Sequence, residues 1–196
     1  MTALCLRRGL AVVLVSLVII GPADSARAQA LTPDPGAWRP LVSANLQKPT
    51  RRDATYVDIW QDAIEANNRA YRARGDRRLS GGAAPASEAH FVIWSAKRAV
   101  VLSVLDTALG CSEKARKAGA VVKLCPMRVA IYEGLHVRTL AAGRGCFIEP
   151  AAGVTLGATA ALYGAYDAAA RALKIGAIVD RRALDGCSFT IPLGRE

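Results

Sequence analysis

Apolar side chains follow three different patterns along the chain. An unbroken apolar run covers residues 9–21, a helical spacing begins near residue 55, and short apolar runs separated by glycines follow residue 120. Such patterns are typical of a leader or membrane segment, an amphipathic helix and strands, respectively. The hydrophobic pattern therefore predicts an apolar leader, at least one helix and a group of strands.

The clearest helix is expected over residues 55–74. Thr55 and Asp58 resemble a capping box at its start, and Gly75 is the residue type that commonly follows a helix end. Four apolar residues then fall on one face, at the spacing of a helical stripe: Val57, Trp60, Ile64 and Tyr71.

Two further tracts are read as helices. Residues 96–110 fit a helical stripe that lasts for three turns, although their β-branched content also suits a strand. A short continuation is expected from Ser112 through Lys117. Residues 151–173 are small and apolar, and the segment from Leu162 onward carries a second helical stripe.

The remaining apolar runs are short and predict strands, with glycines at the turns. Pro126 lies between two of them and should mark a bend or a sheet edge. Because groups of strands lie between helices, we expect an α+β fold: a small antiparallel sheet packed with two or three helices. The expected strands are His90–Ser95, Val121–Leu124, Met127–Tyr132, His136–Leu140, Cys146–Ile148, Ile175–Val179 and Ser188–Pro192.

The apolar leader has the layout of a secretory signal peptide. Arg7 and Arg8 precede the apolar run, and small residues make cleavage sites that end at Ala28 or Ala30. The run is too short to span a bilayer as a helix. We expect residues 1–30 to be cleaved, 31–54 to form a proline-rich arm and 55–196 to form a single α+β domain in a bacterial periplasm or outside the cell.

Loss of the leader leaves four cysteines, an even number that indicates two disulfides in an oxidising compartment. Three pairings are open, and the sequence does not choose among them. We favour Cys111–Cys125 with Cys146–Cys187, because near neighbours in sequence meet most easily. The cysteines lack the closely spaced pairs of zinc sites, so we expect no metal ion and no cofactor.

The chain is basic, with a formal net charge of +10 that falls to +8 once residues 1–30 are removed. Its densest basic patch spans the predicted end of the first helix and the loop after it: Arg69, Arg72, Arg74, Arg77 and Arg78. Arginine side chains bind phosphate and carboxylate groups through paired hydrogen bonds. We therefore expect an anionic envelope polymer or an acidic protein as partner, and no nucleic acid.

Sequence motifs of known catalytic sites are missing from the chain. The sequence holds no nucleophile elbow, phosphate-binding loop or zinc-protease motif. The best candidates for acid–base chemistry are Glu133 and His136, which lie near a predicted strand end, with Glu149 as a second carboxylate.

These observations favour a secreted or periplasmic, non-enzymatic binding or interaction protein that uses the basic patch. One alternative is a glycan or peptidoglycan hydrolase that uses Glu133 and His136. Another is a membrane-associating assembly protein that uses residues 151–166, where Gly153 and Gly157 have the spacing of helix-packing motifs. Otherwise we expect membrane contact only through an uncleaved leader.

Overall fold

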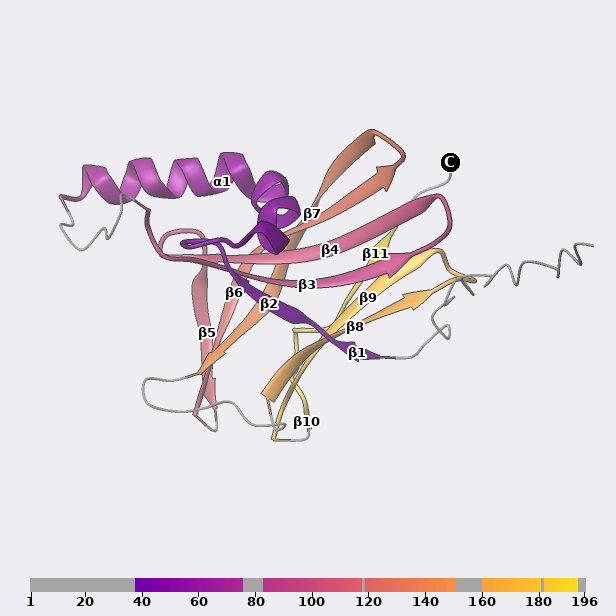
Figure 1. The fold of residues 1–196 in the computed structure, drawn as a ribbon. Coiled ribbons are helices and arrows are strands. Elements are labelled where there is room, and N and C mark those ends of the chain that lie inside the picture. Colours follow the sequence, from indigo (N-terminus) through magenta and orange to yellow (C-terminus); the bar gives the residue numbers. More distant parts are fainter. Residues whose placement is uncertain (1–37, 76–82, 118, 151–159, 181, 194–196) are drawn as a thin grey trace, which may run out of the picture.

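The computed structural model describes residues 38–75, 83–117, 119–150, 160–180 and 182–193. Figure 1 shows two antiparallel sheets and, within the described residues, one α-helix. The first sheet has six strands: β2 (Val42–Asn45), β3 (Ala86–Trp94), β4 (Arg98–Thr107), β5 (Ser112–Lys117), β6 (Ala120–Glu133) and β7 (His136–Pro150). The second has five: β1 (Arg39–Pro40), β8 (Ala160–Asp167), β9 (Ala172–Val179), β10 (Arg182–Ala183) and β11 (Phe189–Pro192).

The expectation of an α+β fold with two or three helices is wrong. Most of the tract 96–110 is strand β4, and the expected continuation at 112–117 is strand β5. The helix expected over 151–173 is replaced from residue 160 onward by β8, a turn and the start of β9, while residues 151–159 lie outside the described residues. The protein is mostly β, with two antiparallel sheets.

Burial on both faces explains why β4 resembles a helix in the sequence. Val100, Leu102 and Val104 face the second sheet, while Val101 and Leu105 pack under the helix. A strand buried on both sides loses the alternation of apolar and polar residues that identifies a half-exposed strand. Its continuous apolar run then fits a helical period by chance.

The long strands β6 and β7 each join two of the expected strands. β6 pairs with β7 along its length, and on its other side it pairs first with β5 and then with β4. Pro126 lies where β6 changes partner, and the register with β7 shifts between Pro126 and Arg128. Because proline has no N–H to donate, this break in the ladder suits it, and the predicted bend is confirmed.

The single helix, α1 (Ala54–Ala73), confirms the prediction for residues 55–74. The capping box expected at Thr55 and Asp58 is not where the sequence predicted it. Thr50 and Asp53 form the box instead, before the helix, at the 3₁₀ turn η1 (Arg51–Asp53). Gly75 adopts a φ of 68° and donates its N–H to the Arg72 carbonyl at 2.9 Å, as expected for a glycine after a helix end.

The elements form three layers, with α1 on one face of the six-strand sheet and the five-strand sheet on the other. Trp60 and Ile59 of α1 pack against the sheet, and a larger core fills the space between the two sheets. The sheets touch where Phe91 of β3 lies against Gly164 of β8. A Cβ at Gly164 would lie 2.7 Å from Cγ of Phe91, so a larger residue there would push the sheets apart.

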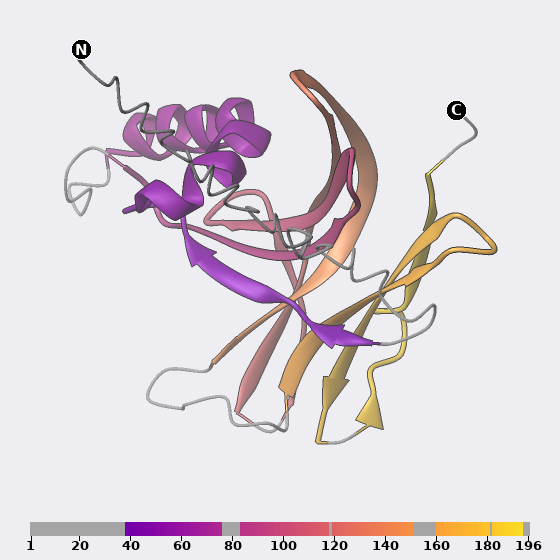
Figure 2. The same ribbon diagram turned by 45° about the vertical axis from the view of Figure 1, so that its right-hand side comes forward.

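The segment just before α1 connects the two sheets. Arg39 and Pro40 pair with β8, and the next residues, from Val42 to Asn45, pair with β3. Figure 2 shows this segment passing from the edge of one sheet to the edge of the other. The part of the expected proline-rich arm that the structure describes thus takes strand positions in both sheets.

Two disulfides join Cys111 to Cys125 and Cys146 to Cys187, which confirms the favoured pairing. Such bonds fit a protein that works outside the reducing cytoplasm. Among the described residues, no helix has the length and apolar character needed to cross a membrane. The expected signal peptide and its cleavage sites at Ala28 and Ala30 lie outside the described residues.

Candidate functional site

The catalytic candidates Glu133 and His136 lie together at the tip of the β6–β7 hairpin. They are cross-strand partners, and both are exposed. The Glu133 carboxylate forms an ion pair with Arg98 at 3.1 Å. Glu149 lies toward the far end of β7, opposite Val121. The structure therefore brings Glu133 and His136 together at an exposed turn, and it separates Glu149 from them.

Glu149 instead belongs to an ion cluster at the other end of the sheet. The ammonium of Lys123 contacts Asp106 at 2.8 Å and Glu149 at 2.7 Å. Burial acts to lower the pKa of Lys123, but the two hydrogen bonds outweigh it and raise the pKa overall. These side chains line a polar pocket of about 170 Å³. A lysine already held by two carboxylates is a stable structural cation rather than an available base.

The cysteines beside this cluster do not make a metal site. Asp106 lies close to Cys111 and Cys125, but the two sulfurs are joined in a disulfide and provide no thiolate.

A buried polar network under α1 was not predicted from the sequence. Trp60 Nε1 donates to Ser103 Oγ at 2.6 Å, and Ser103 donates to Glu88 Oε1 at 2.6 Å. The other oxygen of Glu88 lies 2.9 Å from His90 Nδ1, and the ring of Tyr56 stacks on His90 at 3.8 Å. Glu88 and His90 are two residues apart on β3 and so share a face, which is the one sequence signal for this network.

This network is not arranged as a hydrolase triad. In a triad the serine bonds to the histidine, whereas Ser103 bonds to the Glu88 carboxylate. Glu88 and Ser103 are both fully buried, so substrate has no access to them. Burial raises the pKa of Glu88, partly offset by its bonds to His90 and Ser103. The network anchors the helix to the sheet.

The described part of the basic patch lies at the C-terminal end of α1. Arg69, Arg72 and Arg74 are exposed, and Arg77 and Arg78 lie outside the described residues. Arg69 forms a long ion pair with Glu65 at 3.7 Å. Among the described residues, no carboxylate pairs with Arg72 or Arg74. The helix end is therefore a site at which an anion would meet little competition.

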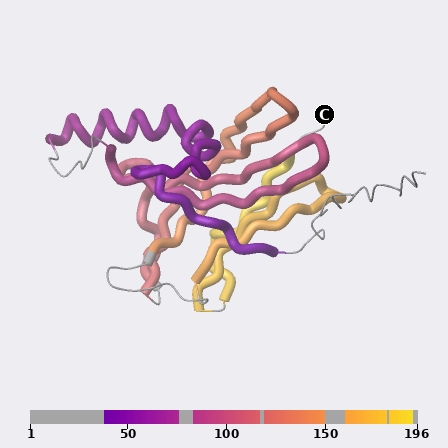
Figure 3. The backbone as a smooth tube through the Cα atoms, in the orientation of Figure 1, coloured from indigo at the N-terminus to yellow at the C-terminus, as the bar shows by residue number. Residues whose placement is uncertain are grey.

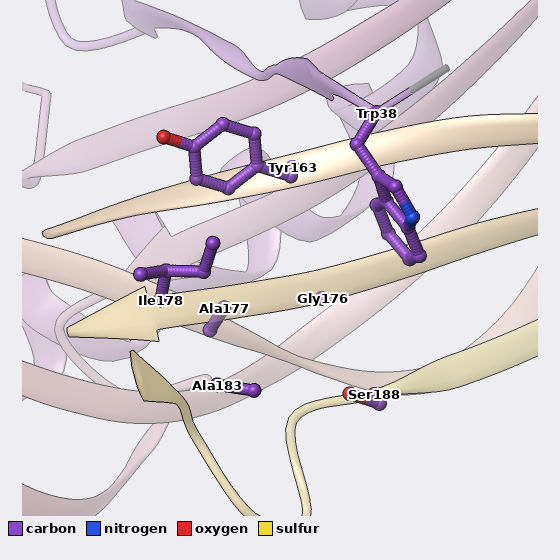
Figure 4. Close-up of a pocket in the computed structure, with 7 residues that line it drawn as sticks. All are labelled: Trp38, Tyr163, Gly176, Ala177, Ile178, Ala183 and Ser188. Atoms are coloured by element: carbon purple, nitrogen blue, oxygen red, sulfur yellow. The ribbon is translucent and has the colours of Figure 1, made fainter. Parts of the chain in front are cut away.

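A pocket of a size that suits a small ligand lies on the outer face of the five-strand sheet. It has a volume of about 340 Å³, which is within the range of small-molecule sites. Figure 4 shows the rings of Trp38 and Tyr163 set apart along the strands on the same side of β9, with Ile178 beside the tyrosine. The seven residues that line this pocket, which we call the outer groove, are Trp38, Tyr163, Gly176, Ala177, Ile178, Ala183 and Ser188.

Small residues create the floor of the outer groove. Trp38 precedes β1, and its indole lies over Gly176 of β9, where a Cβ would already be 3.4 Å from Cζ3 of the ring. Ala183 and Ser188 flank the stretch in which the chain leaves β10 and returns as β11. The absence of large side chains at these positions leaves space between the aromatic walls.

The lining determines which chemistry the outer groove can carry out. Among its described lining residues there is no carboxylate, imidazole, thiol or amine, and the side-chain polar groups are the hydroxyls of Tyr163 and Ser188 and the indole N–H of Trp38. A serine hydroxyl such as that of Ser188 is a weak nucleophile unless a general base lies beside it, and the described lining offers no histidine, carboxylate or lysine for that role. Sequence reasoning missed this site because its residues come from separate segments with no shared motif.

The comparisons with known proteins add no relative. No protein family, no curated protein and no solved structure matches this chain.

Proposed function

We propose that the chain is an exported, non-enzymatic binding protein of the bacterial envelope, and that it binds a neutral, largely apolar small molecule in the outer groove. The observation that carries this proposal is a groove of about 340 Å³ lined by Trp38 and Tyr163, with no charged side chain among the lining residues that the structure describes. Apolar ligands bind by removing such surface from water, and the two hydroxyls would orient them. The leader pattern and the two disulfides support export.

The neutral fluorescent probe N-phenyl-1-naphthylamine tests this proposal. We expect saturable binding to the purified protein, and we expect Ala183→Arg to weaken it at least tenfold by filling the groove with a charged side chain. Ala183 is exposed, so the substitution should not disturb the core. The matched control is Ala169→Arg, an exposed position in the turn between β8 and β9. Equal binding by both variants would refute the proposal.

A second binding activity is supported by the exposed arginines of α1. We infer that Arg72 and Arg74, together with Arg69, hold an anionic envelope polymer or an acidic protein. Guanidinium groups without a competing carboxylate keep their paired donors available for phosphate or carboxylate oxygens. Binding at this surface should weaken as salt rises, because exposed charges are screened.

Charge-reversal variants at the two ends of α1 distinguish binding at these arginines from a general effect of the protein's net positive charge. With inorganic polyphosphate as probe, we expect Arg72→Glu with Arg74→Glu to weaken binding at least tenfold and to reduce its salt dependence. The control, Arg51→Glu with Arg52→Glu, makes the same charge change at exposed positions near the other end of α1. If the two double variants bind equally, the arginine site does not exist. Parallel titration with polyglutamate distinguishes a phosphate polymer from an acidic protein.

The hydrolase and membrane-helix alternatives gain no support from the geometry. Glu133 is held in an ion pair on an exposed turn, and Glu149 is separated from it. From residue 160 onward, the tract that would form a membrane-associating helix is strand β8.

A further inference from the structure

Two hairpin tips lie next to each other at one end of the six-strand sheet. β3 and β4 are joined through Ser95 to Lys97, and β6 and β7 are joined through Gly134 and Leu135. Arg98 at the start of β4 faces Glu133 at the end of β6, so the two tips end at the same level. Figure 3 shows the β6–β7 hairpin extending past the helix to a free end.

Apolar side chains are concentrated at these tips and exposed to water. Trp94 is 69% exposed, Leu135 is fully exposed and Val137 is 55% exposed. Trp94, Ala99, Tyr132 and Val137 are successive cross-strand partners, so they form one row on the face of the sheet that carries α1. Hairpin turns usually hold small polar residues, which makes a leucine at the extreme tip unusual. We call Trp94, Leu135 and Val137 the apolar tip.

Local bonds hold both hairpins in shape. Ser95 N–H donates to the Arg98 carbonyl at 2.8 Å, and the Arg98 N–H donates to Ser95 Oγ at 3.1 Å. The Arg98–Glu133 ion pair connects one tip to the other at 3.1 Å. Gly134 has a φ of 60° at the first position of its two-residue turn, which suits a type II′ hairpin. The apolar tip is thus presented by a fixed framework.

Basic side chains surround the apolar tip. Lys97, His136 and Arg138 are exposed there, while the carboxylate of Glu133 is engaged by Arg98. A tryptophan and aliphatic side chains beside basic groups match the interface of a bilayer, where indoles lie at the headgroup level and cations meet anionic lipids.

We propose that the two hairpin tips dock this protein on an anionic lipid surface, with Trp94, Leu135 and Val137 inserted at the headgroup level and Lys97 and Arg138 contacting lipid phosphates. The contact is peripheral and reversible, because the apolar tip is small and only two basic residues contact the lipid phosphates. This surface is separate from the outer groove, so either site can fail without the other.

Vesicle binding by the exported, purified protein tests the docking. We expect cosedimentation with vesicles of phosphatidylethanolamine and phosphatidylglycerol, and at least tenfold weaker partition onto phosphatidylcholine vesicles. Trp94→Ser with Leu135→Ser should reduce partition onto the anionic vesicles at least tenfold. The control, Val42→Ser with Ala169→Ser, changes two exposed apolar residues away from the tips and from the outer groove, and Val42 is 60% exposed. It should bind like the unchanged protein.

Three outcomes would overturn the proposal: no binding to anionic vesicles, equal losses in both double variants, or binding that survives loss of the apolar tip. Thermal unfolding of each variant checks that it is folded, and Lys97→Glu with Arg138→Glu supplies a second, purely electrostatic test. Size-exclusion chromatography with light scattering is run alongside. A dimer that dissociates in the Trp94→Ser, Leu135→Ser variant would assign the apolar tip to a second copy of the chain instead of to lipid.

Discussion

A single buried carboxylate shows how residue chemistry holds the helix in place. Glu88 accepts a hydrogen bond from Ser103, which in turn accepts one from Trp60 of α1, and its second oxygen meets His90. Every polar atom of this chain of bonds has a partner, which makes burial tolerable. Burial still raises the pKa of Glu88, because water no longer stabilises its charged form.

That pKa shift predicts a pH dependence of stability. Relative to Glu88→Gln, which keeps the hydrogen bonds and cannot ionise, the unchanged protein should lose free energy of unfolding as pH rises above the ordinary glutamate value of 4.5. The sign follows because a raised pKa means that the folded state holds its proton more tightly than the unfolded one. Urea unfolding of both proteins between pH 5 and 8 measures the difference. The titratable neighbours of Glu88, His90 and Asp53, are kept in both proteins.

A difference in stability that stays constant with pH would contradict this account of Glu88. Glu88→Ala serves as the comparison, since it leaves Ser103 and His90 without their buried partner and should cost about 1–3 kcal/mol relative to Glu88→Gln at every pH.

At the scale of elements, the two disulfides act on different parts of the fold. Cys111–Cys125 links the turn between β4 and β5 to β6, within one sheet. Cys146–Cys187 connects β7 of that sheet to the segment between β10 and β11 of the other. Their sequence separations are 14 and 41 residues. The longer loop confines the unfolded chain more, so its bond should contribute more stability.

Paired cysteine-to-serine variants measure these contributions. We expect loss of Cys111–Cys125 to cost about 3 kcal/mol and loss of Cys146–Cys187 about 4 kcal/mol in free energy of unfolding. Denaturant unfolding of each variant under non-reducing conditions gives the two values. A larger loss for the shorter loop would show that native contacts, and not loop closure, dominate.

The elements also show which structural features the sequence predicts well and why the other features could not be predicted from it. Helix α1 is amphipathic, with one buried face, so periodicity located it to within a residue at each end. β4 is buried on both faces, so its apolar run carries no strand signature. The even number of cysteines predicted two disulfides, and the pairing favoured among the three possible ones, which joins near neighbours in sequence, is confirmed. The outer groove is formed by residues from four separate segments, among them Trp38, Tyr163, Gly176 and Ser188. No local sequence pattern therefore predicts it.

At the scale of the whole molecule, three candidate surfaces lie on different parts of the fold. The outer groove lies on the five-strand sheet, the arginines lie at the C-terminal end of α1, and the hairpin tips lie at one end of the six-strand sheet. Figure 1 shows the C-terminal end of α1 pointing away from the hairpin tips. A protein docked on lipid through its tips would therefore keep the arginine end free for a second partner.

The central claim is that the outer groove is the ligand site, and NMR mapping tests it most directly. Amide chemical shifts of the labelled protein would be followed while N-phenyl-1-naphthylamine is added. We predict saturable changes centred on Tyr163, Gly176, Ile178 and Ser188, with the residues of the apolar tip unchanged. Changes centred on the hairpin tips or on the core between the sheets, or no saturable change, would contradict the account.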